Sequence, residues 1–390
     1  MKIRTLENVN VKGRFVLLRD DFNVQITDGR IMDAFRIEQS MPTIRKLREA
    51  GAKIAICAHF GRPKGERNME FTLAPIAEHL HVKLIPDCLD KGFMADMRDG
   101  DIVLLENVRF YAGEEKNDPE FAAKLAEGFD IFVNDAFAVS HRAHASTVGV
   151  AEILHSYAGQ LLASEIEHLA RVMENPKRPL LSIVAGSKVS TKLNVLKSLV
   201  KMSDKLIVGG AIGTTFNFAM GKKVGNSLYE ANMKDTALEI LELAGRHNCE
   251  VLVPIDKGVA KDFVRDAVRI NKKLDEISDD DIIIDAGIRT TERNIKAVKS
   301  VKTVIWNGTV GMAEWFPVWS YGSFSIARAL ALETAKGNLE SIVGGGDTVA
   351  ALEETGTKDD MTYVSTGGGA FLEFIEGINL PGIKVLEVRD

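Results

Sequence analysis

A glycine-rich segment near the end of the chain has the residue types of a phosphate-binding loop. Residues 341–343 (SIV) predict a buried strand, residues 349–352 (VAAL) have helical composition, and Gly344, Gly345 and Gly346 lie between them. The free N–H groups and dipole at a helix start attract an anion, and glycines let phosphate oxygens approach the backbone. Asp347 and Thr348 follow, and a carboxylate beside phosphates requires a cation between them, so we expect Asp347 to hold Mg²⁺. In the alternative interpretation, Asp347 is only an N-cap and the glycines form a tight turn.

Basic and polar side chains follow predicted strands in the first half of the chain. Residues 14–19, 53–58, 101–105 and 130–133 predict strands, and apolar spacing predicts a helix over 34–50. Strands that alternate with helices imply a parallel sheet, whose ligand site lies beyond the carboxyl ends of the strands. Arginines gathered there would bind a small, multiply charged anion, although a single arginine is more often a solvated surface charge. The candidates at or after these strand ends are Asp21, Asn23, Arg36, His59, Arg62, Arg109 and Arg142.

The second half repeats the pattern with glycine and lysine in place of arginine. Predicted strands over 180–184, 205–208, 301–305 and 361–364 each end in small residues. Lys188 follows the first of them, a helix containing Lys192 comes next, and Gly210 follows the second, with a helix beginning at Thr214. Glycine loops with lysine suit the phosphates of a nucleotide, whereas arginine forks suit a phosphate or carboxylate on a compact metabolite. Two sites of these kinds imply group transfer between two ligands.

An amphipathic helix is predicted between the two halves, over residues 160–174, and it ends at Asn175-Pro176. We interpret it as the helix that connects two domains. A coiled-coil or partner helix is the rival interpretation, and the absence of further heptads weighs against it.

Length and composition restrict the class of protein. With 390 residues the chain is longer than one hydrophobic core usually grows, so two domains are expected. A net charge of −6 argues against general nucleic-acid binding. Three widely spaced cysteines suit a reducing compartment, and neither a signal peptide nor a membrane-spanning run is apparent, so we expect a cytoplasmic protein. His141 and His144 have no third metal ligand nearby, which disfavours zinc.

Known nucleotide and nucleophile motifs are missing from the sequence. It contains neither G-x-x-x-x-G-K-[ST] nor a strict G-x-G-x-x-G, which excludes the P-loop and the dinucleotide fingerprint. Histidines and serines form no convincing triad.

Ordered motifs along nearly the whole chain resemble the phosphoglycerate kinase family. The matching stretches are RDDFNV (19–24), HFGRP (59–63), ENVRF (106–110), NDAF and HRAHAS (within 134–146), GSKVSTK (186–192), GGGDT (344–348) and STGGGAFLE (365–373).

The resemblance implies an α/β fold of two Rossmann-like lobes, each a parallel sheet flanked by helices, joined by a hinge helix. Residues 1–159 would bind 3-phosphoglycerate or 1,3-bisphosphoglycerate, residues 160–178 would connect the lobes, and residues 179–375 would bind ADP or ATP with Mg²⁺. The tail 376–390 would pack back on the first lobe. A cytoplasmic monomer without nucleic-acid or membrane partners is implied, catalysing reversible phosphoryl transfer in glycolysis by direct in-line displacement with closure of the lobes.

Roles for individual residues also follow from the resemblance. Arg36 and Lys188 would meet the transferring phosphoryl group. The substrate would be bound by Asp21, Phe22, Asn23, Arg36, His59, Phe60, Gly61, Arg62, Arg109 and Arg142. The nucleotide would be bound by Lys192, Gly210, Glu314, Gly344, Gly345, Gly346, Asp347 and Thr348, with Asp347 on the metal.

Some positions depart from the family pattern. Gln25 and Thr309 replace prolines, Phe60 replaces a leucine and Ala211 replaces a glycine. None of these changes removes a charged group, so they concern affinity and loop stiffness more than activity. Two rival functions are a non-catalytic nucleotide sensor, which loss of Lys188, Arg36 or Asp347 would indicate, and a kinase for another carboxylic acid.

Overall fold

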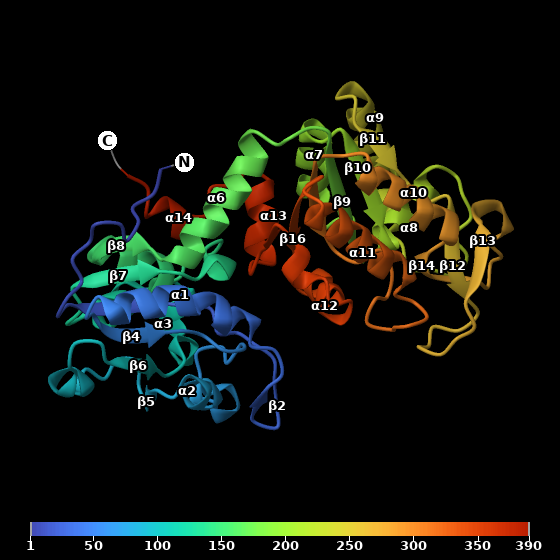
Figure 1. The fold of residues 1–390 in the computed structure, drawn as a ribbon. Coiled ribbons are helices and arrows are strands. Elements are labelled where there is room, and N and C mark those ends of the chain that lie inside the picture. Colours follow the sequence, from blue (N-terminus) through green and yellow to red (C-terminus); the bar gives the residue numbers. More distant parts are fainter. Residues whose placement is uncertain (1, 389–390) are drawn as a thin grey trace. The chain divides into compact units, whose positions relative to one another are not determined.

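The computed structural model describes residues 2–388, and the chain divides into two compact units. Of the described residues, 2–167 and 379–388 form the first unit, and His168–Ile378 form the second. Each unit contains a six-stranded parallel sheet flanked by helices (Figure 1), which confirms the predicted α/β class. Within the described residues, no helix is both long and apolar enough to cross a membrane.

The sheet of the first unit has the strand order β5-β6-β4-β1-β7-β8. From β1 the chain adds strands on one side of the sheet and then returns to add β7 and β8 on the other, so the strand order reverses beside β1. Ligands of open α/β sheets bind beyond the carboxyl ends of the strands at such a reversal. The strands are β1 (Phe15–Arg19), β4 (Lys53–Cys57), β5 (Lys83–Ile85), β6 (Ile102–Leu105), β7 (Ile131–Asn134) and β8 (His155–Ala158).

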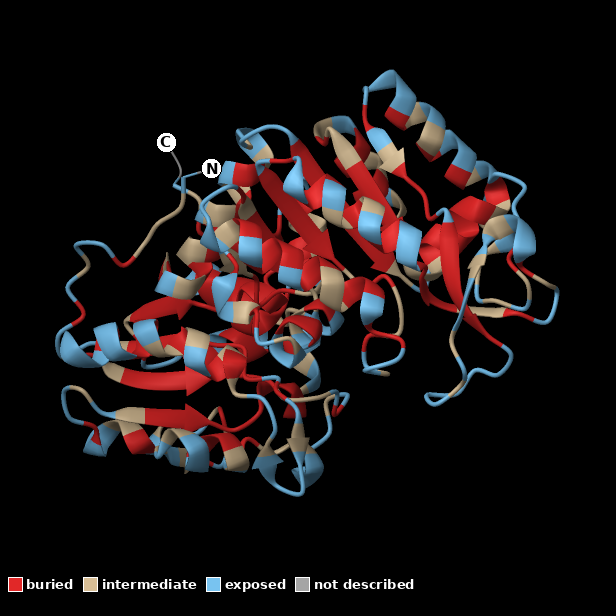
Figure 2. Ribbon diagram, turned by 45° about the vertical axis from the view of Figure 1, so that its right-hand side comes forward, coloured by how far each residue is buried: buried red, intermediate tan, exposed pale blue. Residues whose placement is uncertain are grey.

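Both faces of this sheet are covered, which explains why its strands are continuous apolar runs. Val16 and Leu18 of β1 belong to a core shared with helices α1 (Phe35–Glu49) and α2 (Ala74–Leu80). Leu17 points to the other face, where it joins a core with α4 (Pro119–Ala126) and α5 (Val150–Ile153). Figure 2 shows buried strands and helices with alternating buried and exposed residues.

The carboxyl-terminal segment belongs to the first unit and is held there by backbone and side-chain contacts. Leu380, Ile383 and Leu386 are buried, and Arg4 donates a hydrogen bond of 2.7 Å to the carbonyl of Val385. The short helix α14 (Pro381–Lys384) begins beside Asn134, whose amide donates to the Gly382 carbonyl. Residues 379–388 thus complete the packing of a unit that begins at the opposite end of the chain.

The predicted connecting helix is present as α6 (Gln160–Glu174), and the boundary between the units falls within it. Its start is anchored by Asp135, which accepts the N–H of Leu162 at 2.9 Å, and by Thr43, whose hydroxyl oxygen accepts the N–H of Gln160 at 2.8 Å. Burial raises the pKa of Asp135 to about 7. Only glycine fits at position 159, because a Cβ there would collide with the Asp135 side chain.

The sheet of the second unit has the order β11-β10-β9-β15-β16-β17, which reverses between β9 and β15. One face packs against α10, α11 and α12, and α7, α8 and α9 pack together elsewhere on the unit. The strands are β9 (Leu180–Gly186), β10 (Lys205–Gly209), β11 (Glu250–Leu252), β15 (Thr303–Asn307), β16 (Glu340–Gly344) and β17 (Tyr363–Val364). The helices are α7 (Leu193–Met202), α8 (Gly210–Ala219), α9 (Lys234–Arg246), α10 (Ile288–Lys299), α11 (Tyr321–Ala335), α12 (Gly346–Glu354) and α13 (Gly369–Ile375).

Several boundaries differ from the sequence predictions. Lys192 lies just before α7 rather than inside it, and α8 begins at Gly210 rather than at Thr214. A three-stranded antiparallel sheet, β13-β12-β14, was not predicted. Its strands are β12 (Asp256–Ala260), β13 (Ile270–Lys273) and β14 (Ile282–Ala286). The sequence of β12, DKGVA, lacks an apolar run and therefore gives no strand signal.

Lys257 of β12 is fully buried. Its ammonium donates a long hydrogen bond of 3.3 Å to the hydroxyl oxygen of Thr214 on α8. Burial lowers the pKa of Lys257 to about 7, although Asp285 and Asp256 oppose the shift. Between this value and the ordinary lysine pKa, the unfolded chain binds a proton that the folded chain does not. The penalty of burying the lysine is therefore complete below pH 7 and decreases as the pH rises toward 10.

We expect Lys257→Met to stabilise the protein, because it replaces a poorly paired buried ammonium group by an apolar chain of similar length. The gain in the free energy of unfolding should be on the order of 1–4 kcal/mol at pH 6. It should be smaller at pH 9. Denaturant unfolding followed at both pH values measures this, with the exposed Lys201→Met as control. A variant less stable than the parent at pH 6 would show that the ammonium group makes a net favourable contribution.

Candidate active site

The carboxyl ends of β1, β4 and β6 bring together most of the predicted substrate residues. Arg36 of α1 donates a hydrogen bond of 2.6 Å through Nη1 to Oδ2 of Asp21, which follows β1. The side chain of Asp21 is only 7% exposed. The same nitrogen lies 3.4 Å from the carbonyl oxygen of Asn23. Nε and Nη2 of Arg36 form no hydrogen bond to the described residues, so two arms of the guanidinium remain for a ligand.

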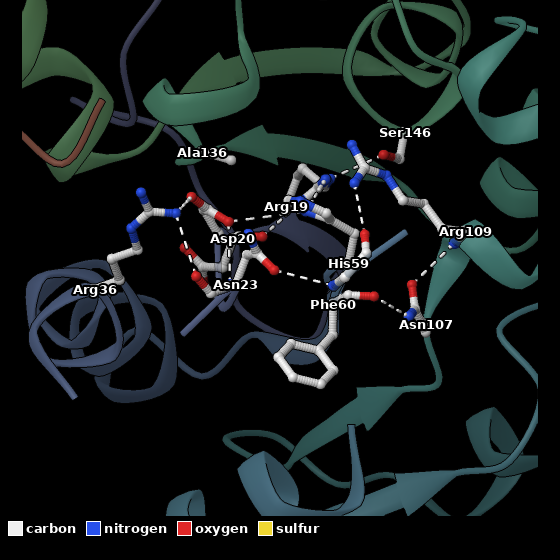
Figure 3. A network of polar contacts seen from close by, with 12 residues as sticks. Arg19, Asp20, Asn23, Arg36, His59, Phe60, Asn107, Arg109, Ala136 and Ser146 are labelled. Carbon is white, nitrogen blue, oxygen red and sulfur yellow. Dashed lines mark hydrogen bonds and ion pairs between the residues drawn. The ribbon is translucent and has the colours of Figure 1, made fainter. Parts of the chain in front are cut away.

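Asn23 and Arg109 fix the loop that follows β4. The Asn23 side chain accepts the N–H of Gly61 at 3.0 Å, and Arg109 donates 2.8 Å to the carbonyl of the same glycine. Asn107 also stabilises this loop, because its side-chain amide donates a hydrogen bond to the Phe60 carbonyl. In Figure 3, Arg36 and Arg109 approach Asn23 and His59 from opposite sides. The cluster is therefore a rigid cradle whose cations come from different elements.

His59 is a neutral hydrogen-bond donor in this cluster. Its Nδ1 lies 3.2 Å from Nη2 of the buried Arg19. A guanidinium can only donate, so Nδ1 must accept and the ring hydrogen belongs on Nε2. Burial and the nearby guanidinium of Arg19 hold the pKa of His59 well below its ordinary value. His59 thus offers an N–H to a ligand without titrating near neutral pH.

The other predicted substrate residues have different environments. Arg142 is partly buried, and its Nε lies 3.2 Å from Nε2 of His141. Burial lowers the pKa of Arg109, and the charges of Arg19 and Arg142 lower it further. Arg62 is exposed and forms no hydrogen bond or ion pair with the described residues. The Phe22 side chain is fully buried in the core, so only its backbone is available to a ligand. Phe60 is partly buried and packs edge-on against Phe71.

In the second unit, the ends of β9, β15 and β16 meet at the reversal of strand order. The Lys192 ammonium donates 2.6 Å to the Ala185 carbonyl and 2.7 Å to Oδ1 of Asn307. The Asn307 side chain in turn donates 2.8 Å to the carbonyl of Gly344. Three strand ends are thus tied to one lysine. Gly210, at the start of α8, donates its N–H to the carbonyl of Val310 in the segment after β15.

Two glycines in this region are required by the backbone and by crowding. Gly308 has φ of 94° and Gly345 has φ of 100°, a region that other residues rarely adopt. A Cβ on Gly308 would collide with the Ala185 carbonyl, and one on Gly345 would lie 2.7 Å from the Asn307 amide. Gly345 is the N-cap of α12, so the alternative interpretation of Asp347 as the N-cap is wrong. The loop therefore presents bare backbone at a helix start.

The predicted metal ligand fits a site shared with a nucleotide. Asp347 is exposed in the first turn of α12, and its charge opposes the lowering of the Lys192 pKa, which places the two groups near each other. The described residues contain no group of three or more potential metal ligands. Mg²⁺ commonly uses one or two carboxylates together with substrate phosphates, and Asp347 suits that arrangement.

The remaining predicted nucleotide residues are placed as follows. Thr348 is buried, and its hydroxyl oxygen accepts the Gly308 N–H at 2.7 Å, which links the end of β15 to α12. Gly346 is exposed at the start of the helix. Glu314 is exposed in the segment between β15 and α11, and Lys188 is exposed after β9. Neither of these two side chains forms an ion pair within residues 2–388, so both are available to a ligand.

Comparison with known proteins identifies the family. The sequence profile described as "Phosphoglycerate kinase" matches residues 6–378. The chain belongs to the phosphoglycerate kinase family. Proteins called phosphoglycerate kinase in Granulibacter bethesdensis and Caulobacter vibrioides are 46% and 44% identical to it, over 99% of this chain and 100% of theirs. The resemblance inferred from the motifs is therefore confirmed.

Solved structures agree with this assignment to the phosphoglycerate kinase family. The structure of phosphoglycerate kinase from Coxiella burnetii has a TM-score of 0.88 at 42% identity. The crystal structure of phosphoglycerate kinase from Pyrococcus horikoshii OT3 has a TM-score of 0.84 at 29% identity. Both comparisons cover 98% of each chain.

Within this phosphoglycerate kinase fold, several residues of the site were missed by sequence reasoning. Arg19 donates through Nε to the hydroxyl oxygen of Ser146 at 2.8 Å, and Ser146 donates 2.6 Å to the buried Glu114. Arg19 and Ser146 lie inside motifs that match the family, so their position was a usable signal. Glu114 lies in no such motif, and only the fold shows that it supports Arg19.

If Lys192 binds nucleotide phosphates, as the sequence predicts, ADP binding is expected to depend on pH. Burial lowers its pKa to about 8. A bound phosphate favours the charged amine, so above pH 8 nucleotide binding requires uptake of a proton. We expect the ADP dissociation constant to be constant from pH 7 to 8 and then to rise, by up to about tenfold per pH unit. Calorimetry measures this, and Lys192→Met should bind weakly without the rise. A parent constant that stays flat to pH 9.5 would contradict this role.

Proposed function

We propose that this protein is a phosphoglycerate kinase that transfers a phosphoryl group reversibly from 1,3-bisphosphoglycerate to ADP, giving 3-phosphoglycerate and ATP. The observation that carries the proposal is the difference between its two clusters. The first unit gathers guanidinium groups around Asp21, Asn23 and His59, and the second gathers glycine backbone around Lys192. Guanidinium forks suit a compact phosphorylated acid, and bare backbone at a helix start suits nucleotide phosphates.

On the substrate side, each residue has a specific role in the proposal. Arg109 and Arg142, with Arg62, supply charge for the substrate's phosphate, and His59 donates its Nε2–H to a substrate oxygen. Asn23 and Asp21 are acceptors suited to a substrate hydroxyl. Arg36 is bound to Asp21 through one arm and directs the others toward the transferring group.

On the nucleotide side, the α12 start and Lys192 bind phosphates, and Glu314 accepts hydrogen bonds from the ribose hydroxyls. Asp347 would hold Mg²⁺, which when bound neutralises charge on the nucleotide phosphates. Lys188 extends to the transferring phosphoryl group. Direct transfer needs reacting atoms within about 3–3.5 Å, so the proposal includes a closed state with α6 as the hinge.

The proposed reaction needs no general base. The leaving group is a carboxylate, and in the reverse direction the attacking carboxylate is already ionised at neutral pH. What this chain must supply is orientation, exclusion of water and stabilisation of charge on the transferring group. The neutral His59 and the cations Arg36 and Lys188 meet those needs without transferring a proton.

A coupled assay tests the proposal. ATP consumption with 3-phosphoglycerate should greatly exceed consumption with acetate, and both ADP formation and the reverse reaction should depend on Mg²⁺. Equal rates with the two acids would indicate a kinase for another carboxylate, and no turnover with either would indicate a nucleotide-binding protein without this activity. We further propose a cytoplasmic monomer, and light scattering of the purified chain tests the monomeric state.

A further inference from the structure

The segment that carries the two proposed nucleotide-site lysines is short and mostly exposed. Lys188 and Lys192 lie between the end of β9 and the start of α7, and Ser190 is between them. The exposed residues of this segment are Ser187, Lys188, Ser190 and Thr191. The Val189 side chain between them is fully buried. A lysine that must meet a transferring phosphoryl group needs a fixed backbone, because a misplacement of about 1 Å can lower the rate about 10²-fold. The Lys192 side chain is held by the Ala185 carbonyl and Asn307. Around Lys188, the bond within the segment is a local one, from the Thr191 hydroxyl to the Lys188 carbonyl.

Glu230 supplies additional support through a two-point contact. Its Oε2 accepts the backbone N–H of Ser190 at 3.0 Å, and its Oε1 accepts the Ser190 hydroxyl at 2.5 Å. Glu230 lies forty residues farther along the chain, after α8, so this contact is not part of the local turn. A carboxylate bound through both oxygens fixes the orientation of the Ser190 peptide as well as its position.

The backbone of Glu230 is fixed to the first turn of α8 through Thr215. The Glu230 N–H donates 3.1 Å to the hydroxyl oxygen of the buried Thr215, and that hydroxyl donates 2.9 Å to the carbonyl of Ala211. Ala211 follows Gly210 in the first turn of α8. A continuous chain of hydrogen bonds therefore runs from the lysine segment to the start of α8.

Glu230 does not neutralise the lysine that it supports. Lys188 forms no ion pair within the described part of the chain, although its charge contributes to the shift of the Glu230 pKa. Burial alone would raise that pKa, but the hydrogen bonds from Ser190 and Val189, together with the charge of Lys188, outweigh burial, so the pKa is lowered. The Glu230 carboxylate is thus ionised at neutral pH, and both of its oxygens accept hydrogen bonds from Ser190. The Lys188 ammonium forms no ion pair with the described residues and can contact a ligand.

We infer that Glu230 is a positioning residue for phosphoryl transfer, holding Lys188 and Lys192 in register with the start of α8 by clamping Ser190. The inference rests on the proposed function, because the two lysines have their roles only in that reaction. Glu230 itself touches neither ligand in this mechanism. Its removal should therefore affect the rate of transfer more than nucleotide affinity.

Steady-state kinetics of Glu230→Gln and Ser190→Ala test the inference, with Glu239→Gln, at an exposed position of α9, as the matched control. Each of the first two variants should lower kcat about tenfold, with the ADP dissociation constant changed less than threefold and the melting temperature unchanged. The double variant Glu230→Gln/Ser190→Ala should be no slower than the slower single variant, because each single substitution disrupts the same contact between Glu230 and Ser190. Glu230→Asp, which keeps the charge but shortens the chain, should recover part of the rate. Parental kcat in both single variants would overturn the inference.

Hydrogen exchange separates this inference from the proposed function. The Ser190 amide should exchange at least tenfold faster in Glu230→Gln than in the parent or in Glu239→Gln. An inactive parent would overturn the proposed function, and the catalytic part of the inference with it. An active parent whose Ser190 amide and kcat are both unchanged in Glu230→Gln would overturn the clamp alone.

Discussion

Lys188→Ala is expected to lower kcat by about 10²–10³-fold while changing the ADP dissociation constant less than threefold. Lys188 is exposed and forms no ion pair within residues 2–388. Its ammonium is therefore not needed for folding and is free to meet charge that develops on the transferring phosphoryl group. An interaction made mainly in the transition state affects kcat rather than binding.

Lys201→Ala is the matched control, because Lys201 is exposed in the last turn of α7 in the same unit. It should have parental kinetics. Single-turnover measurements with both ligands saturating separate the transfer step from product release. A Lys188→Ala variant within threefold of the parental rate would exclude the catalytic role, and a loss confined to ADP affinity would make Lys188 a binding residue instead.

The fold could be predicted from sequence where elements depend on continuous or periodic apolar residues. The strand β1 and the helix α6 are such cases, because one is buried on both faces and the other has apolar residues at helical spacing. The antiparallel strand β12 was missed, since Asp256, Lys257 and Gly258 are buried there by partners far away in sequence. Tertiary contacts, rather than local propensity, determine that strand.

The candidate site divides in the same way. Residues that follow strand ends within a few positions, such as Asp21 and Asp347, could be selected as candidates because parallel strands end at one edge of a sheet. The residues that hold them could not. Glu114 and Glu230 each act on a serine far along the chain, and a glutamate in an exposed-looking sequence carries no sign of such a contact. Supporting residues of this kind depend on the assembled fold.

In the first unit, the cations are organised by internal acceptors before any ligand arrives. Arg19 is occupied by Ser146 and the His59 ring, Arg109 by the Gly61 carbonyl, and Arg36 by Asp21. Each arginine is thus oriented, so little side-chain entropy remains to be lost on binding. The Asp21 carboxylate also limits the mutual repulsion of these cations, and it becomes an uncompensated charge if its partner is removed.

Arg36→Ala is expected to lower kcat by about 10²–10³-fold and to weaken 3-phosphoglycerate binding less than tenfold. The arginine has two unused arms beside Asp21, and a guanidinium there can stabilise charge on the transferring group. Truncation also leaves Asp21 without its closest cation, so part of any loss could come from that carboxylate. The double variant Arg36→Ala/Asp21→Asn removes this second effect.

The double variant distinguishes the two causes. If Arg36 acts on the phosphoryl group, Arg36→Ala/Asp21→Asn should stay at least about 10²-fold slower than Asp21→Asn alone, and Arg36→Lys should recover only part of the rate because it lacks the planar fork. Arg45→Ala, an exposed position on the same helix, should be parental in kcat and in melting temperature. Recovery of the Asp21→Asn rate in the double variant would assign Arg36 to charge balance instead, since neutralising Asp21 would then have removed the whole need for the guanidinium.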